Sequence, residues 1–217
     1  MEKDILLFDL DGTLTDPMVG ITKSVQYALR HYGIIEEDLT RLIPFIGPPL
    51  RDSFQKYYGF SKEQAGEGVL VYREYFSEKG IFENKEIPGI REMLEVLSAQ
   101  GKKLYVATSK PDEMARQILS HLGLEKYFEF IGGANDDSTR VNKDDVIRYV
   151  METCNLTDVD SIVMVGDRKH DIEGAHKAGI KAAGVLYGYG DEKELKGAGA
   201  DWLAENPGEL AALLISL

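Results

Sequence analysis

Short apolar segments alternate along the chain with segments whose apolar residues recur at helical spacing. The first of them, residues 5–8, is uniformly apolar, which is typical of a strand buried on both faces of a parallel sheet. Similar segments follow at residues 104–107, 128–131, 162–165 and 183–186. Strands that alternate with helices in this way predict an α/β fold with a doubly wound parallel sheet.

The segments between the predicted strands show apolar stripes and recognisable end signals. One predicted helix carries Ile90 and Leu97 and ends at Gly101, because glycine readily adopts the left-handed conformation that follows many helices. A second ends at Gly123 in the same way, and Asn142 is placed to cap the start of a third. These helices would cross from strand to strand over the faces of the sheet.

The stretch between about residues 15 and 82 interrupts the alternation, because it shows helical patterns and no good strand. Ile21, Val25 and Ala28 repeat at helical spacing, and residues 61–64 match a capping box at the start of another helix. We therefore predict an all-α domain at residues 15–82. It is inserted into an α/β domain formed by residues 1–14 and 83–217.

Composition narrows the class of protein. The 217 residues are 43% apolar and 29% charged, as in ordinary globular proteins, and 37 acidic against 25 basic residues give a formal charge of −12. Such a charge disfavours nucleic acid as a partner. Cys154 is the single cysteine, so no intrachain disulfide is possible, and no apolar run is long enough for a membrane helix. We expect a cytoplasmic protein without a membrane or nucleic-acid partner, and the sequence leaves its oligomeric state open.

Polar residues that follow the predicted strands are expected to meet at one edge of the sheet, because ligands of open parallel sheets bind beyond the carboxyl ends of the strands. Lys143, at the start of a predicted crossover helix, belongs to the same edge. The residues concerned are Asp9, Asp11, Thr108, Ser109, Lys110, Lys143, Asp167 and Asp171.

Several carboxylates at one edge need a balancing positive charge. Two like charges about 4 Å apart repel by about 4 kcal/mol at an effective dielectric constant of about 20. A hard divalent cation held by oxygen ligands relieves this repulsion, and room for water and phosphate favours Mg²⁺. Beside it, one aspartate can attack phosphorus, a second can transfer protons, and a hydroxyl and a lysine can hold the phosphoryl oxygens. The pattern predicts phosphoryl transfer.

These residues resemble the four motifs of the haloacid dehalogenase (HAD) superfamily. The motifs are Asp-Leu-Asp-Gly-Thr-Leu at residues 9–14, Thr-Ser-Lys at 108–110, Lys143, and Gly-Asp at 166–167 followed by Asp171. The inserted helical segment is similar to that superfamily's C1 cap. The resemblance implies a HAD-like Rossmannoid core. It is strongest to the phosphoglycolate phosphatase-like hydrolases, some of which are 5′-nucleotidases.

The resemblance implies a role for each catalytic position. Asp9 would be the nucleophile and a metal ligand, and Asp11 the general acid and base, with its backbone carbonyl on the metal. Thr108 would hydrogen-bond the phosphoryl group, and Lys143 would balance its charge. Lys110 stays open as the alternative phosphate lysine, because acidic residues flank Lys143 where many relatives have proline.

The metal and substrate positions complete the expected site. Asp167 would ligate Mg²⁺, and Asp171, one helical turn later, would orient metal-bound water or ligate the metal. Arg51 follows a Gly-Pro-Pro-Leu segment that is similar to the specificity loop of related caps. The expected substrate-binding residues are Gly12, Thr13, Ser109, Lys110 and Arg51. Residues 187–190, Tyr-Gly-Tyr-Gly, lack the lysine and spacing of a phosphate-binding loop and predict a turn near the rim.

The expected activity is that of a Mg²⁺-dependent phosphomonoesterase acting on a small phosphorylated metabolite, such as phosphoglycolate or a nucleoside monophosphate. A phosphosugar mutase similar to β-phosphoglucomutase is the alternative, because Asp9 and Asp11 suit both. A dehalogenase is disfavoured by the presence of Asp11. A phosphonoacetaldehyde hydrolase would need a cap lysine, for which Lys23 is the candidate, and a non-catalytic scaffold would be expected to show a damaged acid pair.

Overall fold

The computed structural model describes residues 3–135, 140 and 142–217. The chain divides into two compact units, an α/β unit formed by Met1–Asp16 with Glu86–Leu217 and a helical unit formed by Pro17–Lys85.

The α/β unit is built on a six-stranded sheet in the order β5-β4-β1-β6-β7-β8, and every neighbouring pair is parallel. Residue Ile5 of the central strand pairs with Lys103 on one side and with Ile162 on the other. The strands are β1 (Ile5–Phe8), β4 (Lys103–Pro111), β5 (Phe130–Ala134), β6 (Ile162–Gly166), β7 (Lys181–Val185) and β8 (Trp202–Ala204). This order confirms the predicted doubly wound parallel sheet.

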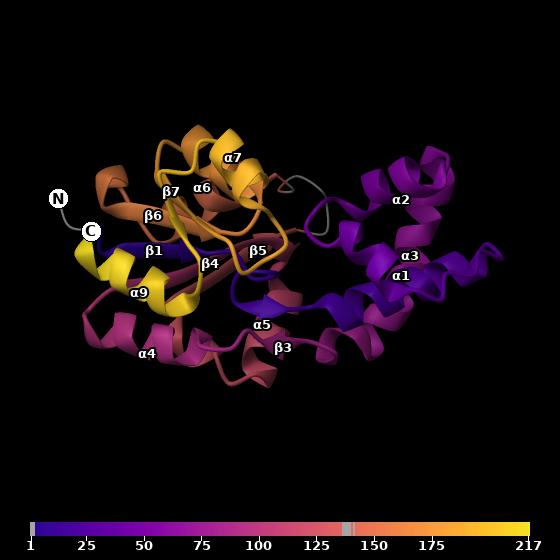
Figure 1. Cartoon of the computed structure of the whole chain (residues 1–217), viewed down its shortest axis with the longest axis horizontal. Helices are drawn as coiled ribbons and strands as arrows, with labels where there is room; N and C mark the ends of the chain where they lie inside the picture. The colour runs from indigo at the N-terminus through magenta and orange to yellow at the C-terminus, as the bar shows by residue number, and fades with distance from the viewer. Residues whose placement is uncertain (1–2, 136–139, 141) are drawn as a thin grey trace. The chain divides into compact units, whose positions relative to one another are not determined.

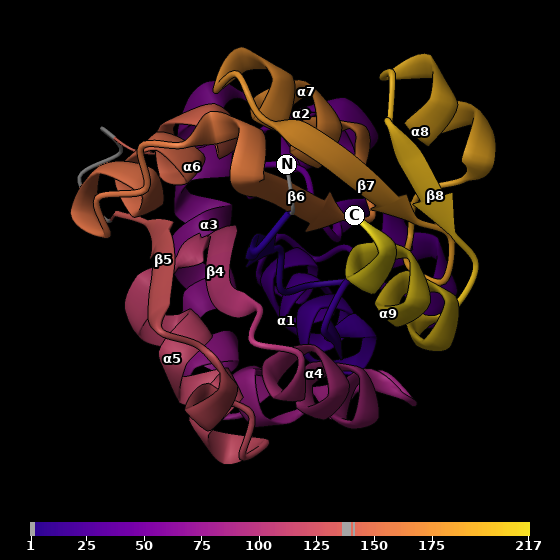
Figure 2. The same ribbon diagram turned by 90° about the vertical axis from the view of Figure 1, so that its left-hand side faces the viewer.

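Helices cover both faces of this sheet. Helices α6 and α7 lie on one face, and α4, α5 and α9 lie on the other (Figures 1 and 2). The helices of the unit are α4 (Ile90–Ala99), α5 (Asp112–His121), α6 (Lys143–Thr153), α7 (Lys169–Lys177), α8 (Glu192–Gly197) and α9 (Pro207–Ser216), with short 3₁₀ turns at Glu125–Tyr127 and Val159–Ser161. Gly101 and Gly123 both have positive φ just after helices, as the sequence predicts.

The core of the α/β unit explains why the strands are uniformly apolar. Leu7 and Met164 point into a buried cluster with Val146 and Ile147 of α6 and Ile172 of α7, all 0% exposed. Because the opposite sheet face is also covered by helices, both faces of each central strand need apolar side chains. The carboxyl ends of these strands are thereby held in fixed register, and the candidate site is built on them.

The helical unit contains α1 (Met18–His31), α2 (Leu50–Tyr58) and α3 (Lys62–Glu78), with 3₁₀ helices at Leu39–Phe45 and Gly80–Phe82. The predicted capping box is present: the Ser61 hydroxyl accepts the N–H of Gln64, and the Gln64 side chain accepts the N–H of Ser61. Phe54 stacks on Phe60 with ring centroids 5.4 Å apart. Two further short strands, β2 (Thr15–Asp16) and β3 (Lys85–Glu86), form a separate two-stranded sheet.

The structure shifts one predicted strand and adds elements that the sequence pattern did not indicate. The strand expected at residues 128–131 is found at Phe130–Ala134, because Phe128 ends a 3₁₀ turn and only then does the chain become extended along β4. Strand β8 and helices α8 and α9 were not predicted from the sequence. Among the described residues, no helix combines the length and the apolar character needed to cross a membrane.

Candidate active site

The ends of three neighbouring strands place polar side chains at one edge of the sheet. Asp9 directly follows β1, and its N–H donates to the carbonyl oxygen of Val165 (2.9 Å), so the pairing with β6 continues as far as Asp9. Thr108 lies in β4, where its hydroxyl accepts the N–H of Lys110 (3.2 Å). Asp167 directly follows β6. All three polar side chains are buried, with Asp9 8%, Thr108 2% and Asp167 0% exposed.

Three carboxylates form a compact group. Oxygen atoms of Asp9, Asp167 and Asp171 lie within 4.8 Å of one another. Asp171 reaches the group from the first turn of α7, where its Oδ2 accepts the N–H of Arg168 (3.0 Å). An ideal Cβ at Gly166 would lie 2.2 Å from the Asp171 carboxyl carbon, so only glycine lets α7 start this close to the strand.

Lys143 joins two of these carboxylates. Its Nζ lies 2.7 Å from Asp9 Oδ1 and 2.8 Å from Asp171 Oδ1, and it also donates to the carbonyl oxygen of Ala107 (3.1 Å). Burial by itself lowers the pKa of Lys143, but the carboxylates of Asp171 and Asp9 outweigh burial and raise the pKa above its ordinary value. The side chain is therefore a buried ammonium ion beside the carboxylate of Asp9.

The acidic neighbours of Lys143 do not draw its ammonium group away. Asp144 pairs with Arg148 (2.9 Å), and Asp145 accepts a hydrogen bond from the Asn142 amide (3.0 Å). Asn142 occupies the N-cap position of α6 as predicted, but its side chain makes no cap hydrogen bond.

Asp11 has a different lysine. Its Oδ2 lies 2.8 Å from Lys110 Nζ, and its Oδ1 is buried and accepts no hydrogen bond from the described residues. Burial raises the pKa of Asp11 above its usual range, and the Lys110 ammonium only partly opposes this. An acid with a raised pKa beside a reacting group is suited to donate a proton. The two lysines that the sequence leaves as rivals thus contact different aspartates.

The pKa values of Asp167 and Asp171 are also raised, and burial is the main cause in both. Burial raises the pKa of Asp167 well above its ordinary value, and the neighbouring carboxylates of Asp171 and Asp9 raise it further. Burial likewise raises the pKa of Asp171 to about 6, although the Lys143 ammonium opposes the rise. A group of three buried carboxylates with only oxygen donors has the composition of a site for a hard divalent cation.

The expected substrate-binding residues lie in two places. Gly12 has φ of +84° in the turn after Asp9, and the buried Thr13 has its hydroxyl 3.5 Å from Asp167 Oδ1. Ser109 is exposed beside Thr108. Arg51 lies in the first turn of α2 in the helical unit, where its side chain is exposed.

Sequence reasoning missed one part of the site. Residues 187–190 do form a loop near the rim, but the backbone N–H of Tyr189 also donates to Asp167 Oδ2 (2.7 Å). The Tyr-Gly-Tyr-Gly composition was the available signal, because glycines mark places where backbone passes close to other atoms.

The contacts of Lys23 do not suit it to form a Schiff base. Lys23 pairs with Glu83 (2.6 Å), and its hydrogen bond to that carboxylate raises the pKa of the lysine, which is unfavourable for a Schiff-base amine.

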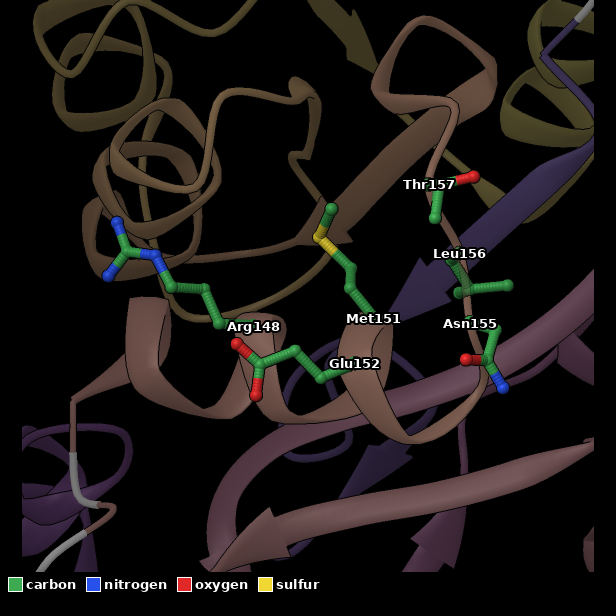
Figure 3. A pocket seen from close by; sticks show the side chains of 6 residues that line it. All are labelled: Arg148, Met151, Glu152, Asn155, Leu156 and Thr157. Atoms are coloured by element: carbon green, nitrogen blue, oxygen red, sulfur yellow. The ribbon is translucent and has the colours of Figure 1, made fainter.

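A surface pocket lies along the C-terminal half of α6 and the chain that follows (Figure 3). It is lined by Arg148, Met151, Glu152, Asn155, Leu156 and Thr157, and none of the clustered carboxylates contributes to it.

Comparison with known proteins agrees with this geometry. Residues 6–185 match the family model described as haloacid dehalogenase-like hydrolase. The chain belongs to this family. It is therefore an enzyme, and its relatives place it among the phosphatases of the family.

Three similar proteins illustrate the family. A 5′-nucleotidase from Pseudomonas aeruginosa is 48% identical over 88% of this chain and 86% of the relative. The crystal structure of a predicted phosphatase from Clostridium acetobutylicum has a TM-score of 0.95 at 46% identity and covers 100% of both chains. The tyrosine-protein kinase PtkA of Mycobacterium tuberculosis is 40% identical over 86% of this chain, but the match spans only 63% of that relative.

Proposed function

We propose that this hydrolase is a Mg²⁺-dependent phosphomonoesterase that cleaves a small phosphorylated metabolite through a covalent phosphoryl group on Asp9. The observation that carries the proposal is the position of Asp9, which shares a group of carboxylates with Asp167 and Asp171 and contacts the Lys143 ammonium. Nucleoside monophosphates are the first substrate class to test, because the 48% identical relative is a 5′-nucleotidase. Phosphoglycolate is the second, because a phosphoglycolate phosphatase from Aquifex aeolicus is 29% identical over 97% of the chain.

The carboxylates of Asp9, Asp167 and Asp171 would hold the cation. The fit rests on their oxygen-only donor set, their burial and the raised pKa of both Asp167 and Asp171. When bound, Mg²⁺ supplies positive charge that lets an anionic ester approach an anionic nucleophile. The backbone carbonyl of Asp11 is a further proposed ligand.

In the first step, a carboxylate oxygen of Asp9 forms a bond to phosphorus while the bond from phosphorus to the ester oxygen breaks. Asp11 gives its proton to the departing oxygen, for which its raised pKa is suited. Lys143 and the Thr108 hydroxyl would hold phosphoryl oxygens, where charge resides in the transition state. The products are an alcohol and a phosphorylated Asp9.

In the second step, Asp11 acts as a base. Its carboxylate takes a proton from water, the water oxygen bonds to phosphorus, and the bond from phosphorus to Asp9 breaks. Inorganic phosphate leaves, and Asp9 and Asp11 return to their starting protonation states. The pairing of Asp11 with Lys110 (2.8 Å) would hold the Asp11 carboxylate in place between the two steps.

The helical unit, Pro17–Lys85, would act as a cap that excludes bulk water during the reaction and supplies contacts to the rest of the substrate. Arg51 is the candidate for an anionic substrate group. We propose substrate-binding roles for Arg51, Gly12, Thr13, Ser109 and Lys110, and substrate kinetics can test them. A cap of this kind favours a small phosphate ester as substrate, and we propose that the enzyme acts in the cytoplasm.

Asp11→Asn is expected to make the rate depend strongly on the leaving group. Alkyl phosphates need a proton on the departing oxygen, so their turnover should fall by at least about 100-fold. With p-nitrophenyl phosphate the first step needs little acid help. Stopped-flow measurement should therefore show a burst of nitrophenol followed by slow turnover. Alkyl phosphate rates equal to those of the wild type would remove Asp11 from the mechanism.

Mg²⁺ is expected to stabilise the folded protein, and more so at pH 7.5 than at pH 5. Asp171 has a raised pKa in the folded protein, so it still holds its proton at pH values where the unfolded chain has lost it. Its contribution to the free energy of unfolding therefore falls as pH rises through roughly 4 to 6. The cation must displace any protons that its ligands still hold, so its affinity grows with pH. At about 100 times its Kd the ion should add about 2.7 kcal/mol, or roughly 5–10 °C in Tm.

Thermal unfolding with and without Mg²⁺ at both pH values measures this effect, and Asp167→Asn provides the variant that should lose most of it. A Tm that does not respond to Mg²⁺ at pH 7.5 would count against the cation site.

A mutase of the same architecture would return the phosphoryl group to a sugar hydroxyl rather than to water. Incubation with a hexose phosphate and a sugar bisphosphate separates the two activities. We expect free phosphate, whereas an isomerised ester would favour the mutase. Ranking about a hundred phosphate esters by kcat/KM would then identify the substrate class.

A further inference from the structure

The loop that follows β7 contacts two separate parts of the candidate site. The backbone N–H of Tyr189 donates to Asp167 Oδ2 (2.7 Å), and the Tyr187 hydroxyl donates to the carbonyl oxygen of Thr13 (3.1 Å). The Tyr189 hydroxyl also donates to the carboxylate of Asp16, the last residue of β2. The loop therefore connects the turn that follows Asp9 with the end of β6.

Glycines make this close approach possible. An ideal Cβ at Gly188 would lie 2.3 Å from Asp167 Cβ and 2.5 Å from the carbonyl oxygen of Gly12. One at Gly190 would lie 2.0 Å from the Asp167 carbonyl oxygen, and one at Gly12 would lie 2.2 Å from Asp167 Oδ2. Real Cβ atoms essentially never come within 3.0 Å of other atoms, so a side chain at any of these positions would force Asp167 or its neighbours to move.

Asp167 depends on this loop for its orientation. The residue is 0% exposed, and its contact with the Thr13 hydroxyl is long at 3.5 Å. The 2.7 Å bond from the Tyr189 N–H is much shorter, and a carboxylate that accepts a backbone N–H is held by a charge-assisted hydrogen bond. Displacing residues 188–190 would release the Asp167 carboxylate.

We propose that residues 187–190 position Asp167. They hold its carboxylate close to the turn that follows Asp9, and in this way they set the affinity of the site for its divalent cation. The inference rests on the proposed function, because it requires Asp167 to bind the cation. Partners that orient a metal ligand commonly change metal affinity by about 10- to 100-fold when they are lost. These residues touch neither the phosphoryl group nor the departing oxygen in the proposed mechanism.

The test is Mg²⁺ binding by isothermal titration calorimetry, a readout that does not depend on turnover. Gly188→Ala should raise the Kd for Mg²⁺ by about 10- to 100-fold. The matched control is Gly197→Ala in α8, where an ideal Cβ meets no atom within 4 Å, and its Kd should stay within about twofold of the wild type. Circular dichroism melting establishes that each variant is folded before titration.

A second variant keeps the inference testable if Gly188→Ala does not fold. The double variant Tyr187→Phe/Tyr189→Phe keeps both rings and the Tyr189 N–H but removes the hydroxyls that hold the loop to Thr13 and Asp16. Loss of these hydrogen bonds should raise the Kd for Mg²⁺ by about 3- to 10-fold.

Activity measurements add a second distinction. At saturating Mg²⁺, kcat of a folded loop variant should return to within a few-fold of the wild type, with KM for the substrate unchanged. A wild-type Kd for Mg²⁺ in the folded loop variants would overturn the positioning role and leave the proposed function intact. Failure of the wild-type protein to bind Mg²⁺ would instead overturn the proposed function itself.

Discussion

Asp9→Asn is expected to lower kcat for phosphate-ester hydrolysis by at least about 1000-fold, because it removes the atom that bonds to phosphorus. Asparagine has nearly the same shape, so the strand pairing through the residue 9 N–H (2.9 Å to Val165) should persist. Lys143 would also keep its contact with Asp171 (2.8 Å). The fold should survive while the nucleophile is lost. Hydrolysis of p-nitrophenyl phosphate with and without EDTA measures the effect.

The matched control is Asp4→Asn, an exposed aspartate just before the other end of β1. It makes the same chemical change in the same part of the chain, and its kcat should equal that of the wild type. Wild-type turnover in Asp9→Asn would refute the nucleophile assignment.

Lys143→Met is expected to damage both stability and catalysis. The substitution leaves the carboxylates of Asp9 and Asp171 buried without their ammonium partner, and removing one member of a buried ion pair costs about 3–5 kcal/mol. Loss of a charged donor to the phosphoryl oxygens should lower kcat by about 100- to 1000-fold. Urea unfolding of the metal-free protein gives the first quantity, and steady-state kinetics at saturating Mg²⁺ gives the second.

Two further lysine variants serve as controls for Lys143→Met. Lys103→Met changes an exposed lysine at the start of β4 and should alter the free energy of unfolding by no more than about 0.5 kcal/mol. Lys110→Met leaves both ion pairs of Lys143 intact, so its effect on kcat should be smaller than that of Lys143→Met. A larger effect at Lys110 would make it the lysine that balances the phosphoryl charge.

The central strands could be predicted from the sequence because their burial is two-sided. A uniformly apolar segment such as Ile5–Phe8 has few other places in a globular protein, and the observed strand has the predicted bounds. The capping box at Ser61 was predictable for a similar reason, since it depends on contacts within four residues.

The strands at the edges of the sheet were harder to predict, because tertiary contacts determine where they begin and end. Strand β8 has only three residues, and two of them are partly exposed, so no apolar run marks it. Helix α9 begins with Asn206 as its cap and Pro207 in its first turn, a local signal that could have predicted it. At β5, a 3₁₀ turn delays the strand by two residues, which the apolar pattern around Phe128 does not reveal.

Part of the candidate site could be predicted from the sequence, and part could not. The positions of these residues just after predicted strands, or at the start of a predicted helix, were enough to predict that Asp9, Asp167 and Asp171 meet at one edge of the sheet. Which lysine faces which acid depends on contacts such as that between Lys143 and Asp9, 134 residues apart, and no local pattern encodes them. The support of Asp167 by Tyr189 is equally remote in sequence, which is why the loop appeared only as a turn.

Locating the phosphoryl group tests the role of Asp9 as nucleophile. Asp11→Asn should accumulate the phosphorylated enzyme, because the second step lacks its base. After reaction with p-nitrophenyl phosphate, acid quenching and proteolysis, mass spectrometry should find the mass of one phosphoryl group on Asp9, and none when Mg²⁺ is withheld. A burst of nitrophenol with Asp9 unmodified, or a phosphoryl group on another residue, would contradict the proposed mechanism.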